Sequence, residues 1–183
     1  MTDMILERSF EPAISTAFVL ELAMNAAGCF GIHAVEWKAS YLGLDGRRML
    51  CHFSAPDMES TRIALRQMDA DMSRLWRVSV HDAPGLGAAD IASANVIVER
   101  DFADAVELQA IQNIEDAGIH CLEMRNVRSA RTFFATDRRR MLCLYAAPDA
   151  ESVRQAQREA GVPFAEAWAF TRYGPEQLVQ SSG

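Results

Sequence analysis

The chain has 183 residues, half of them hydrophobic and 23% charged, with a net charge of −7. This composition predicts a folded globular protein and argues against a nucleic-acid partner held by neutralisation of phosphate charge. No apolar run approaches the ~20 residues that a membrane helix requires, and the first residues lack the apolar core of a signal peptide. The four cysteines lack the C-x-x-C spacing of metal sites, so we expect reduced thiols in a cytoplasmic protein.

The first predicted element is a strand from Met4 to Phe10, and a similar segment, Val96 to Phe102, follows 92 residues later. Each carries a Glu-Arg pair with a Phe two residues after the Arg. A helical pattern follows each strand. In the first copy Ser15 is the predicted N-cap, and Gly28 and Gly31 are expected to end the helix.

A second strand is predicted next, and we align its beginning, Ile32–Glu36, with Ile119–Glu123, 87 residues later. With this alignment, the first copy has five more residues than the second in its first helix or the adjoining loop. The second copy has five more residues than the first in its hairpin. It makes His33 and His120 matched residues at the start of the second strand. In a regular strand, a glutamate three residues after such a histidine points to the opposite face.

The most distinctive sequence, Arg-Arg-Met-Leu-Cys followed by Ala-Pro-Asp-x-Glu-Ser, occurs within residues 47–60 and again within 139–152. It predicts a third strand with a cysteine in the core, then a helix whose N-cap is Asp57 or Asp149. A closing strand around Trp76 completes the first copy, and its counterpart completes the second.

Each copy is therefore predicted to fold as β-α-β-β-α-β, the ferredoxin-like unit. We expect a first repeat at 1–82, a linker at 83–94, a second repeat at 95–174 and a polar, frayed tail at 175–183. Both faces of the third strand are largely apolar, as expected when both are covered. The fold prediction is α+β, with the two repeats packed sheet to sheet as a pseudo-dimeric α+β barrel. Two independent units, or sheets that each pair with another chain, are the alternatives.

These motifs give the sequence a recognisable family likeness. The Glu-Arg-x-Phe strand, the cysteine strand and Ala-Pro-Asp-x-Glu-Ser-x-x-Arg resemble the bacterial family catalogued as domain of unknown function 4242, as two fused copies. The matching residues are Glu7, Arg8, Phe10, Cys51, Ala55, Pro56, Asp57, Glu59 and Arg62, and Glu99, Arg100, Asp101, Phe102, Cys143, Ala147, Pro148, Asp149, Glu151 and Arg154. The resemblance implies ferredoxin-like units that pair into an α+β barrel, in a family that includes nickel-binding members. Ala39, Ala64 and Ala156 stand where the family often has histidine, so this chain lacks those imidazole ligands.

The charged pairs on the first strands are candidate ligand-binding residues: Glu7, Arg8, Glu99 and Arg100. If the glutamates line a space between the sheets, two carboxylates approach each other, with shifted proton affinities suited to cation binding or acid–base chemistry. If each glutamate instead meets an arginine from a neighbouring strand, it forms a structural ion pair.

His33 and His120 are the candidate metal ligands, since a symmetric pair could converge on one metal or ligand. The alternative is a histidine that is hydrogen-bonded near a strand end. Glu36 and Glu123 complete the candidate ligand-binding set. No catalytic residue is predicted, because no Ser-His-Asp order, phosphate loop or dinucleotide motif is present.

The function predicted first is a small binding protein that holds a small molecule or cation between its two sheets. A nickel-binding protein like members of the family is the second hypothesis. The third, an enzyme, rests only on analogy with α+β barrels, which include monooxygenases and dismutases. We expect a small molecule or metal ion as partner, no nucleic acid and no membrane, with an intramolecular pseudo-dimer that leaves further homo-oligomers open.

Overall fold

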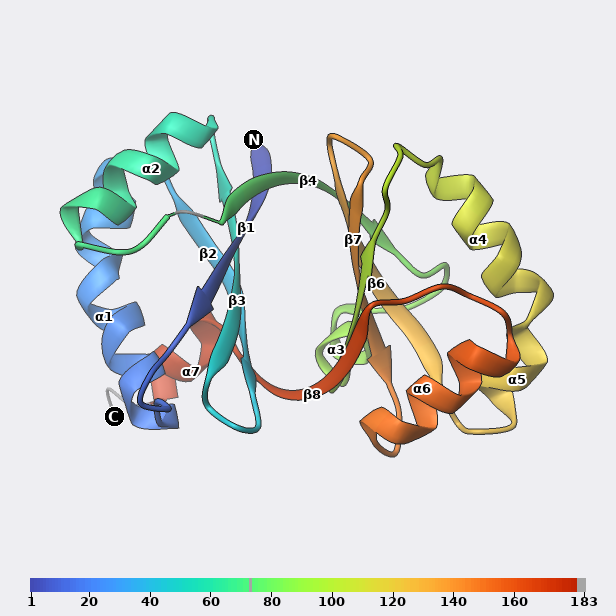
Figure 1. Ribbon diagram of the computed structural model, residues 1–183. Helices are drawn as coiled ribbons and strands as arrows, with labels where there is room; N and C mark the ends of the chain where they lie inside the picture. Colours follow the sequence, from blue (N-terminus) through green and yellow to red (C-terminus); the bar gives the residue numbers. More distant parts are fainter. Residues whose placement is uncertain (73, 181–183) are drawn as a thin grey trace. The chain divides into compact units, whose positions relative to one another are not determined.

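The computed structural model describes residues 1–72 and 74–180 and is drawn in Figure 1. The elements along the chain are β1 (Thr2–Ser9), α1 (Thr16–Ile32), β2 (Glu36–Gly43), β3 (Arg48–Ala55), α2 (Met58–Gln67), β4 (Leu75–Asp82), α3 (Ala88–Ala92), β5 (Val96–Asp101), α4 (Leu108–Ala117), α5 (Ile119–Glu123), β6 (Arg128–Ala135), β7 (Arg140–Ala146), α6 (Ala150–Glu159), β8 (Glu166–Tyr173) and α7 (Pro175–Gln180). The predicted linker 83–94 contains helix α3, and the predicted tail contains helix α7. Residues 181–183 of that tail lie outside the described residues.

The strands form one closed antiparallel barrel. Their hydrogen-bonded order is β1-β3-β2-β8-β5-β7-β6-β4, closing back to β1. The strand β1 pairs with β3 along its whole length, from Thr2 opposite Ala55 to Ser9 opposite Arg48. The α+β barrel predicted from the sequence is thus confirmed at the level of architecture. No helix in the described part of the chain combines the length and apolar character needed to cross a lipid bilayer.

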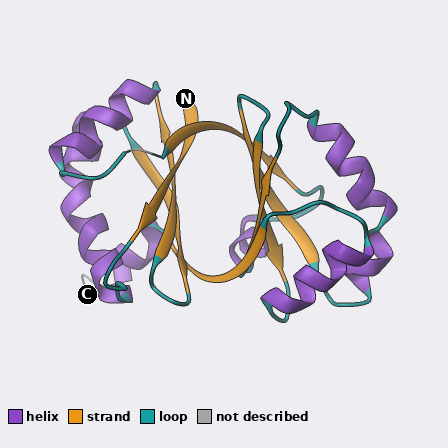
Figure 2. Ribbon diagram, in the orientation of Figure 1, coloured by secondary structure: helices purple, strands orange, loops and turns teal. Residues whose placement is uncertain are grey.

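The chain divides into two compact units. The first unit comprises Met1–Val78 and the segment from Thr171 onward, and the second comprises Ser79–Phe170. The boundaries between the units therefore fall within β4 and β8, so each of these strands has one end in the first unit and the other end in the second. Helices α1 and α2 lie together on one face of the strands of the first unit, and α4 and α6 do so in the second (Figure 2).

The first unit is built as its local sequence dictates. Ser15 caps α1 by accepting a hydrogen bond from the backbone of Phe18, and Asp57 caps α2 by accepting one from Ser60. On β1, Met4 and Leu6 face the helices and join the core, so Arg8, two residues further, shares their face. Glu7 therefore lies on the opposite face of the same strand.

The predicted beginning of the second strand is wrong. Helix α1 continues through Gly28 and Gly31 to Ile32, and the chain then turns at Ala34, whose φ is 52°. Positive φ is rare outside glycine, so this residue marks a sharp break before β2 starts at Glu36. Both glycines are in open surroundings, where a helix tolerates them at a modest cost.

The same break occurs in the second unit, at Asn126, with a φ of 54°, two residues before β6 starts at Arg128. Positions 34 and 126 are 92 residues apart, as are the starts of β2 and β6, of β3 and β7, and of α2 and α6. The predicted 87-residue offset is therefore incorrect, and we call residues 92 apart counterparts. His33 caps the C-terminus of α1, whereas His120 lies within α5, so neither starts a strand.

The second unit differs from the first in its helices. At the position matching the interior of α1, Gly118 separates α4 from α5. A Cβ atom at Gly118 would lie 2.4 Å from the Cβ of Ala160, so the backbone here is in direct contact with the end of α6. In the first unit the counterparts of this pair are Ala26 and Met68, whose larger side chains do not permit such a close approach.

Candidate ligand site

Arg100 is one of the largest fully buried side chains of the second unit, with 1% of its surface exposed. Its guanidinium donates hydrogen bonds to the backbone oxygen of Pro163 (2.6 Å), to the hydroxyl of Tyr145 (3.1 Å) and to Oε1 of Gln157 (2.9 Å). A buried cation requires such partners, because removing it from water without them is costly.

A carboxylate completes this group. The Tyr145 hydroxyl donates to Oε1 of Glu115, which projects from α4 and is 6% exposed. Burial lowers the pKa of Arg100, but the nearby Tyr145, Cys143 and Glu115 outweigh that effect and raise it. Burial, followed by the charge of Glu115, raises the pKa of Tyr145 well above its usual value, so the tyrosine stays neutral. The buried set therefore holds one cation and one anion.

In the first unit the counterpart arginine, Arg8, has different surroundings. The counterparts of Glu115, Tyr145 and Gln157 are Ala23, Phe53 and Leu65, none of which has a hydrogen-bonding side chain. The guanidinium carbon of Arg8 lies 5.1 Å from the ring centre of Phe10. Apart from this ring contact, Arg8 makes no hydrogen bond or ion pair with residues 1–72 or 74–180.

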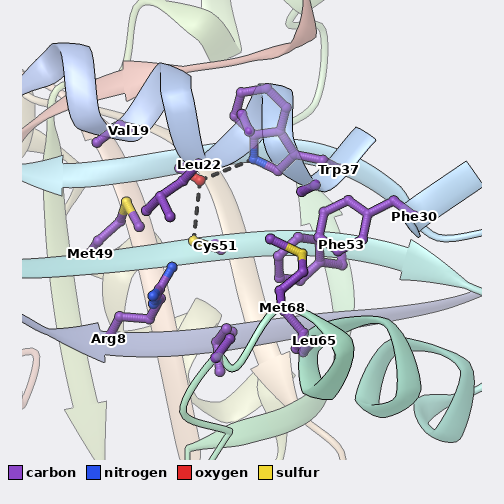
Figure 3. Close-up of a pocket in the computed structure, with 15 residues that line it drawn as sticks. Arg8, Val19, Leu22, Phe30, Trp37, Met49, Cys51, Phe53, Leu65 and Met68 are labelled. Atoms are coloured by element: carbon purple, nitrogen blue, oxygen red, sulfur yellow. Dashed lines mark hydrogen bonds between the residues drawn. The ribbon is translucent and has the colours of Figure 1, made fainter. Parts of the chain in front are cut away.

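Arg8 lines a pocket between the strands and the two helices of the first unit, with a cavity of about 40 Å³ that opens to solvent. A water needs only ~10–15 Å³ of such space, so there is room here for more than one. The lining residues are Leu6, Arg8, Val19, Leu22, Ala23, Ala26, Phe30, Trp37, Ser40, Met49, Cys51, Phe53, Leu65, Met68 and Ala70. Figure 3 shows Arg8 extending from β1 towards Cys51 on β3, beneath Leu22 of α1.

The other polar atoms of the pocket are already paired. Trp37 Nε1 donates to Oγ of Ser40 at 3.0 Å, and that hydroxyl donates to Sγ of Cys51 at 3.2 Å (Figure 3). Burial raises the pKa of the Cys51 thiol, although Ser40 and Arg8 act in the opposite direction. The thiol is therefore neutral at physiological pH and is no activated nucleophile. Arg8 is the one Lys, Arg or His residue in the pocket lining.

The predicted glutamates Glu7 and Glu99 lie on the strand face opposite the two arginines. Trp76 Nε1 donates to Glu7 at 2.7 Å, and Arg74 pairs with the same carboxylate at 3.1 Å. Glu99 has the matching arrangement, in which Trp168 donates at 2.7 Å and Arg140, from the adjoining strand β7, donates at 3.0 Å. Each glutamate thus makes an ion pair within its own unit, with an arginine of strand β7 for Glu99 and with an arginine of the turn before β4 for Glu7.

The remaining predicted residues lie on helical segments or at the surface, away from the pocket lining. His33 Nε2 is 3.2 Å from Oε1 of Gln67, to which the Cys29 thiol also donates at 2.8 Å. His120 is exposed and lies 3.4 Å from Sγ of Cys121.

Glu36 is exposed and pairs with Lys38, and Glu123 is exposed at the end of α5. Of the eight predicted site residues, Arg8 is the one that lines the pocket.

Sequence reasoning missed the residues that make the pocket. Ala23, Phe53 and Leu65 are ordinary core residues when viewed in one copy alone. Their significance appears only beside Glu115, Tyr145 and Gln157, because all three polar residues of the group around Arg100 have apolar counterparts in the first unit. The uniform 92-residue offset would have exposed this replacement.

Comparison with known families and structures gives one partial family match and a fold. Residues 97–169 match the family described as nickel responsive protein SCO4226-like. A putative chlorite dismutase is 10% identical, with a TM-score of 0.53, over 98% of this chain and 97% of that chain. A mutant chlorite dismutase from Candidatus Nitrospira defluvii is 12% identical, with a TM-score of 0.52, over 98% and 94%. At such low identity these two structures show the fold alone, and the comparison with curated proteins gave no match.

The family match makes nickel relevant to the second unit. Among the described residues no three or more His, Cys, Asp or Glu side chains gather in a way that could hold a metal ion. His120 and Cys121 are two donors side by side, and they would leave most coordination positions of a nickel ion unfilled. The side chains present therefore do not form a nickel centre by themselves.

Proposed function

We propose that this protein binds a small organic molecule in the pocket of the first unit, with an apolar body against α1, α2 and the strands and an anionic group at Arg8. One observation carries the proposal. Arg8 projects into a mostly apolar pocket with no hydrogen-bond acceptor among the described residues, whereas its counterpart Arg100 donates to three acceptors.

The composition of the pocket fits that role. Binding sites for small molecules are mostly apolar, with a few polar groups that fix the orientation of the ligand. Here the apolar surface comes from helix residues such as Leu22 and Met68 and from strand residues such as Phe53. Arg8 is partly exposed, so water hydrates it in the free protein, and an anionic ligand would replace that water with a charge-assisted hydrogen bond.

A blocking variant with a matched control tests the proposal. Leu22→Trp adds bulk at the pocket, and Ile114→Trp adds the same bulk at the counterpart position in the second unit. Anilinonaphthalene sulfonate, an apolar anion whose fluorescence rises on binding, serves as the probe. We expect Leu22→Trp to abolish saturable binding and Ile114→Trp to preserve it, at unchanged circular dichroism. Binding that survives Leu22→Trp, or that both variants lose, would overturn the proposal.

A further inference from the structure

We infer that the ligand of this pocket is an apolar monocarboxylic acid, whose carboxylate pairs with Arg8 and offsets its charge, as the Glu115 carboxylate, held by the Tyr145 hydroxyl, offsets the charge of Arg100. This inference rests on the proposed function and adds the chemical class of the ligand. Its starting point is a comparison of two equivalent residues, since each unit has an arginine on the helix-covered face of its first strand. The group around Arg100 includes the carboxylate of Glu115, whereas the pocket around Arg8 has no Asp or Glu in its lining.

The second unit shows which chemistry complements the arginine. Around Arg100 stand a carboxylate from α4, a phenol from β7 and an amide from α6, contributed by Glu115, Tyr145 and Gln157. The charges of Arg100 and Glu115 balance within a region that excludes water. Such a pair is tolerated in a protein interior because each charge is hydrogen-bonded.

The first unit lacks those atoms and keeps the space. Relative to the second unit, Ala23 lacks the carboxylate, Phe53 lacks the phenolic oxygen and Leu65 lacks the amide oxygen. All three residues line the pocket together with Arg8. The first unit thus lacks the groups that accept hydrogen bonds or carry negative charge near the arginine of the second unit. A ligand that takes their place must bring an anionic acceptor.

The charge of the pocket lining favours a carboxylate over a phosphate as the anionic group of the ligand. Arg8 is the single cationic side chain of the pocket, and a guanidinium matches a carboxylate with two parallel hydrogen bonds. A phosphate monoester is close to a dianion at neutral pH and would carry excess negative charge into an apolar site. Since Ser40, Trp37 and Cys51 already bond to one another, the rest of the ligand meets apolar surface.

The first experiment compares hexanoate with hexanol by calorimetry, in the wild-type chain and in Arg8→Met. The two probes share a chain and differ in the charged group. We expect hexanoate to bind about tenfold more tightly or better, as one charge-assisted hydrogen bond provides. In Arg8→Met this preference should vanish. Equal binding of both probes to the wild-type chain, or a preference that survives Arg8→Met, would overturn the carboxylate while leaving the pocket itself supported.

The second experiment gives the first unit its own carboxylate. Ala23→Glu places a glutamate at the counterpart of Glu115. We expect it to abolish hexanoate binding and to raise the melting temperature of the protein relative to Ala23→Gln, which adds the same bulk without charge. That difference between Glu and Gln should disappear in the Arg8→Met background.

A difference between Ala23→Glu and Ala23→Gln that is the same with and without Arg8 contradicts the inference, since no pairing with the arginine then exists. The two proposals fail separately. Loss of sulfonate-probe binding in both tryptophan variants removes the pocket as a site. If the sulfonate probe binds as expected but hexanoate binds no better than hexanol, only the assignment of the ligand class fails.

Discussion

Arg8 and Arg100 occupy counterpart positions on β1 and β5, yet Arg100 donates hydrogen bonds to three acceptors while Arg8 donates none to the described part of the chain. The two residues have equivalent positions in the fold, because each lies on the helix-covered face of a strand that pairs with a cysteine-containing strand, β3 or β7. Their difference comes from residues far along the sequence. In the second unit polar side chains bond to the arginine, whereas in the first unit the arginine lines a pocket.

Replacing Glu115 by Ala should destabilise the second unit strongly. The substitution leaves the buried Tyr145 hydroxyl without its acceptor and Arg100 without a nearby anion, and a buried group left without its partner typically costs ~1–3 kcal/mol. Urea denaturation followed by circular dichroism measures the loss. Glu123→Ala, an exposed glutamate on the neighbouring helix α5, is the control and should change stability little. A cost for Glu115→Ala no larger than that of the control would show that Arg100 does not depend on this carboxylate.

Replacing Glu7 and Glu99 by glutamine should reduce the stability of the protein by different amounts. Glu99→Gln removes one of the two carboxylates that pair with Arg140, whose side chain is 18% exposed, and should cost about 1.5–3 kcal/mol. Glu7→Gln removes the partner of Arg74, which is 60% exposed and can turn to water, so the cost should stay within about 1 kcal/mol. Glutamine keeps an acceptor for the tryptophan in both cases. Equal costs, measured by urea denaturation of both variants, would contradict this account.

The Cys51 thiol should react slowly and report on the pocket. Because burial raises its pKa, alkylation by iodoacetamide should be slow at neutral pH, accelerate towards alkaline pH and slow further when hexanoate occupies the pocket. Peptide mass spectrometry separates it from the partly exposed Cys29, which serves as the internal control. Rapid labelling of Cys51 at neutral pH, unaffected by hexanoate, would be inconsistent with a thiol that lines a filled pocket.

The same shift sets the sign of a pH effect on stability. The folded chain holds the Cys51 proton to higher pH than the unfolded chain, in which a thiol titrates near about 8.5. Its contribution to stability is therefore full below that pH and is lost as pH rises towards the folded pKa. Cys143, whose pKa burial also raises, adds to the same trend. Cys51→Ala should flatten the alkaline decline in the free energy of unfolding, and an unchanged slope would show that another group causes it.

Nickel should bind weakly, despite the partial family match. Since the described side chains gather no group of three donors, calorimetric titration of protein without a histidine tag should show no saturable site at micromolar nickel. The two neighbouring donors His120 and Cys121 are the pair to test. Tight binding that His120→Ala abolishes would instead extend the nickel response of the matched family to this chain.

Much of the architecture follows from local sequence. The repeated Ala-Pro-Asp-x-Glu-Ser motif predicts two helix caps, and Asp57 and Asp149 both accept hydrogen bonds from the residue three positions on. Alternation along β1 predicts that Glu7 and Arg8 face opposite ways, and they do. Glycine was the misleading signal, because Gly28 and Gly31 sit inside a helix that ends only at the positive φ of Ala34. That error moved His33 onto a strand and shifted the alignment by five residues.

The order of the strands, the caps of α2 and α6 and the strand faces of Arg8 and Arg100 follow from local sequence, since they depend on neighbours a few residues away. The surroundings of each arginine depend instead on how distant segments pack. The polar side chains of the group around Arg100 come from α4, β7 and α6, segments that lie apart in the chain and converge through packing. Hydrogen bonding acts across a few ångströms of space regardless of sequence distance. Which of two identical residues is satisfied, and which lines an open pocket, is therefore a property of the fold.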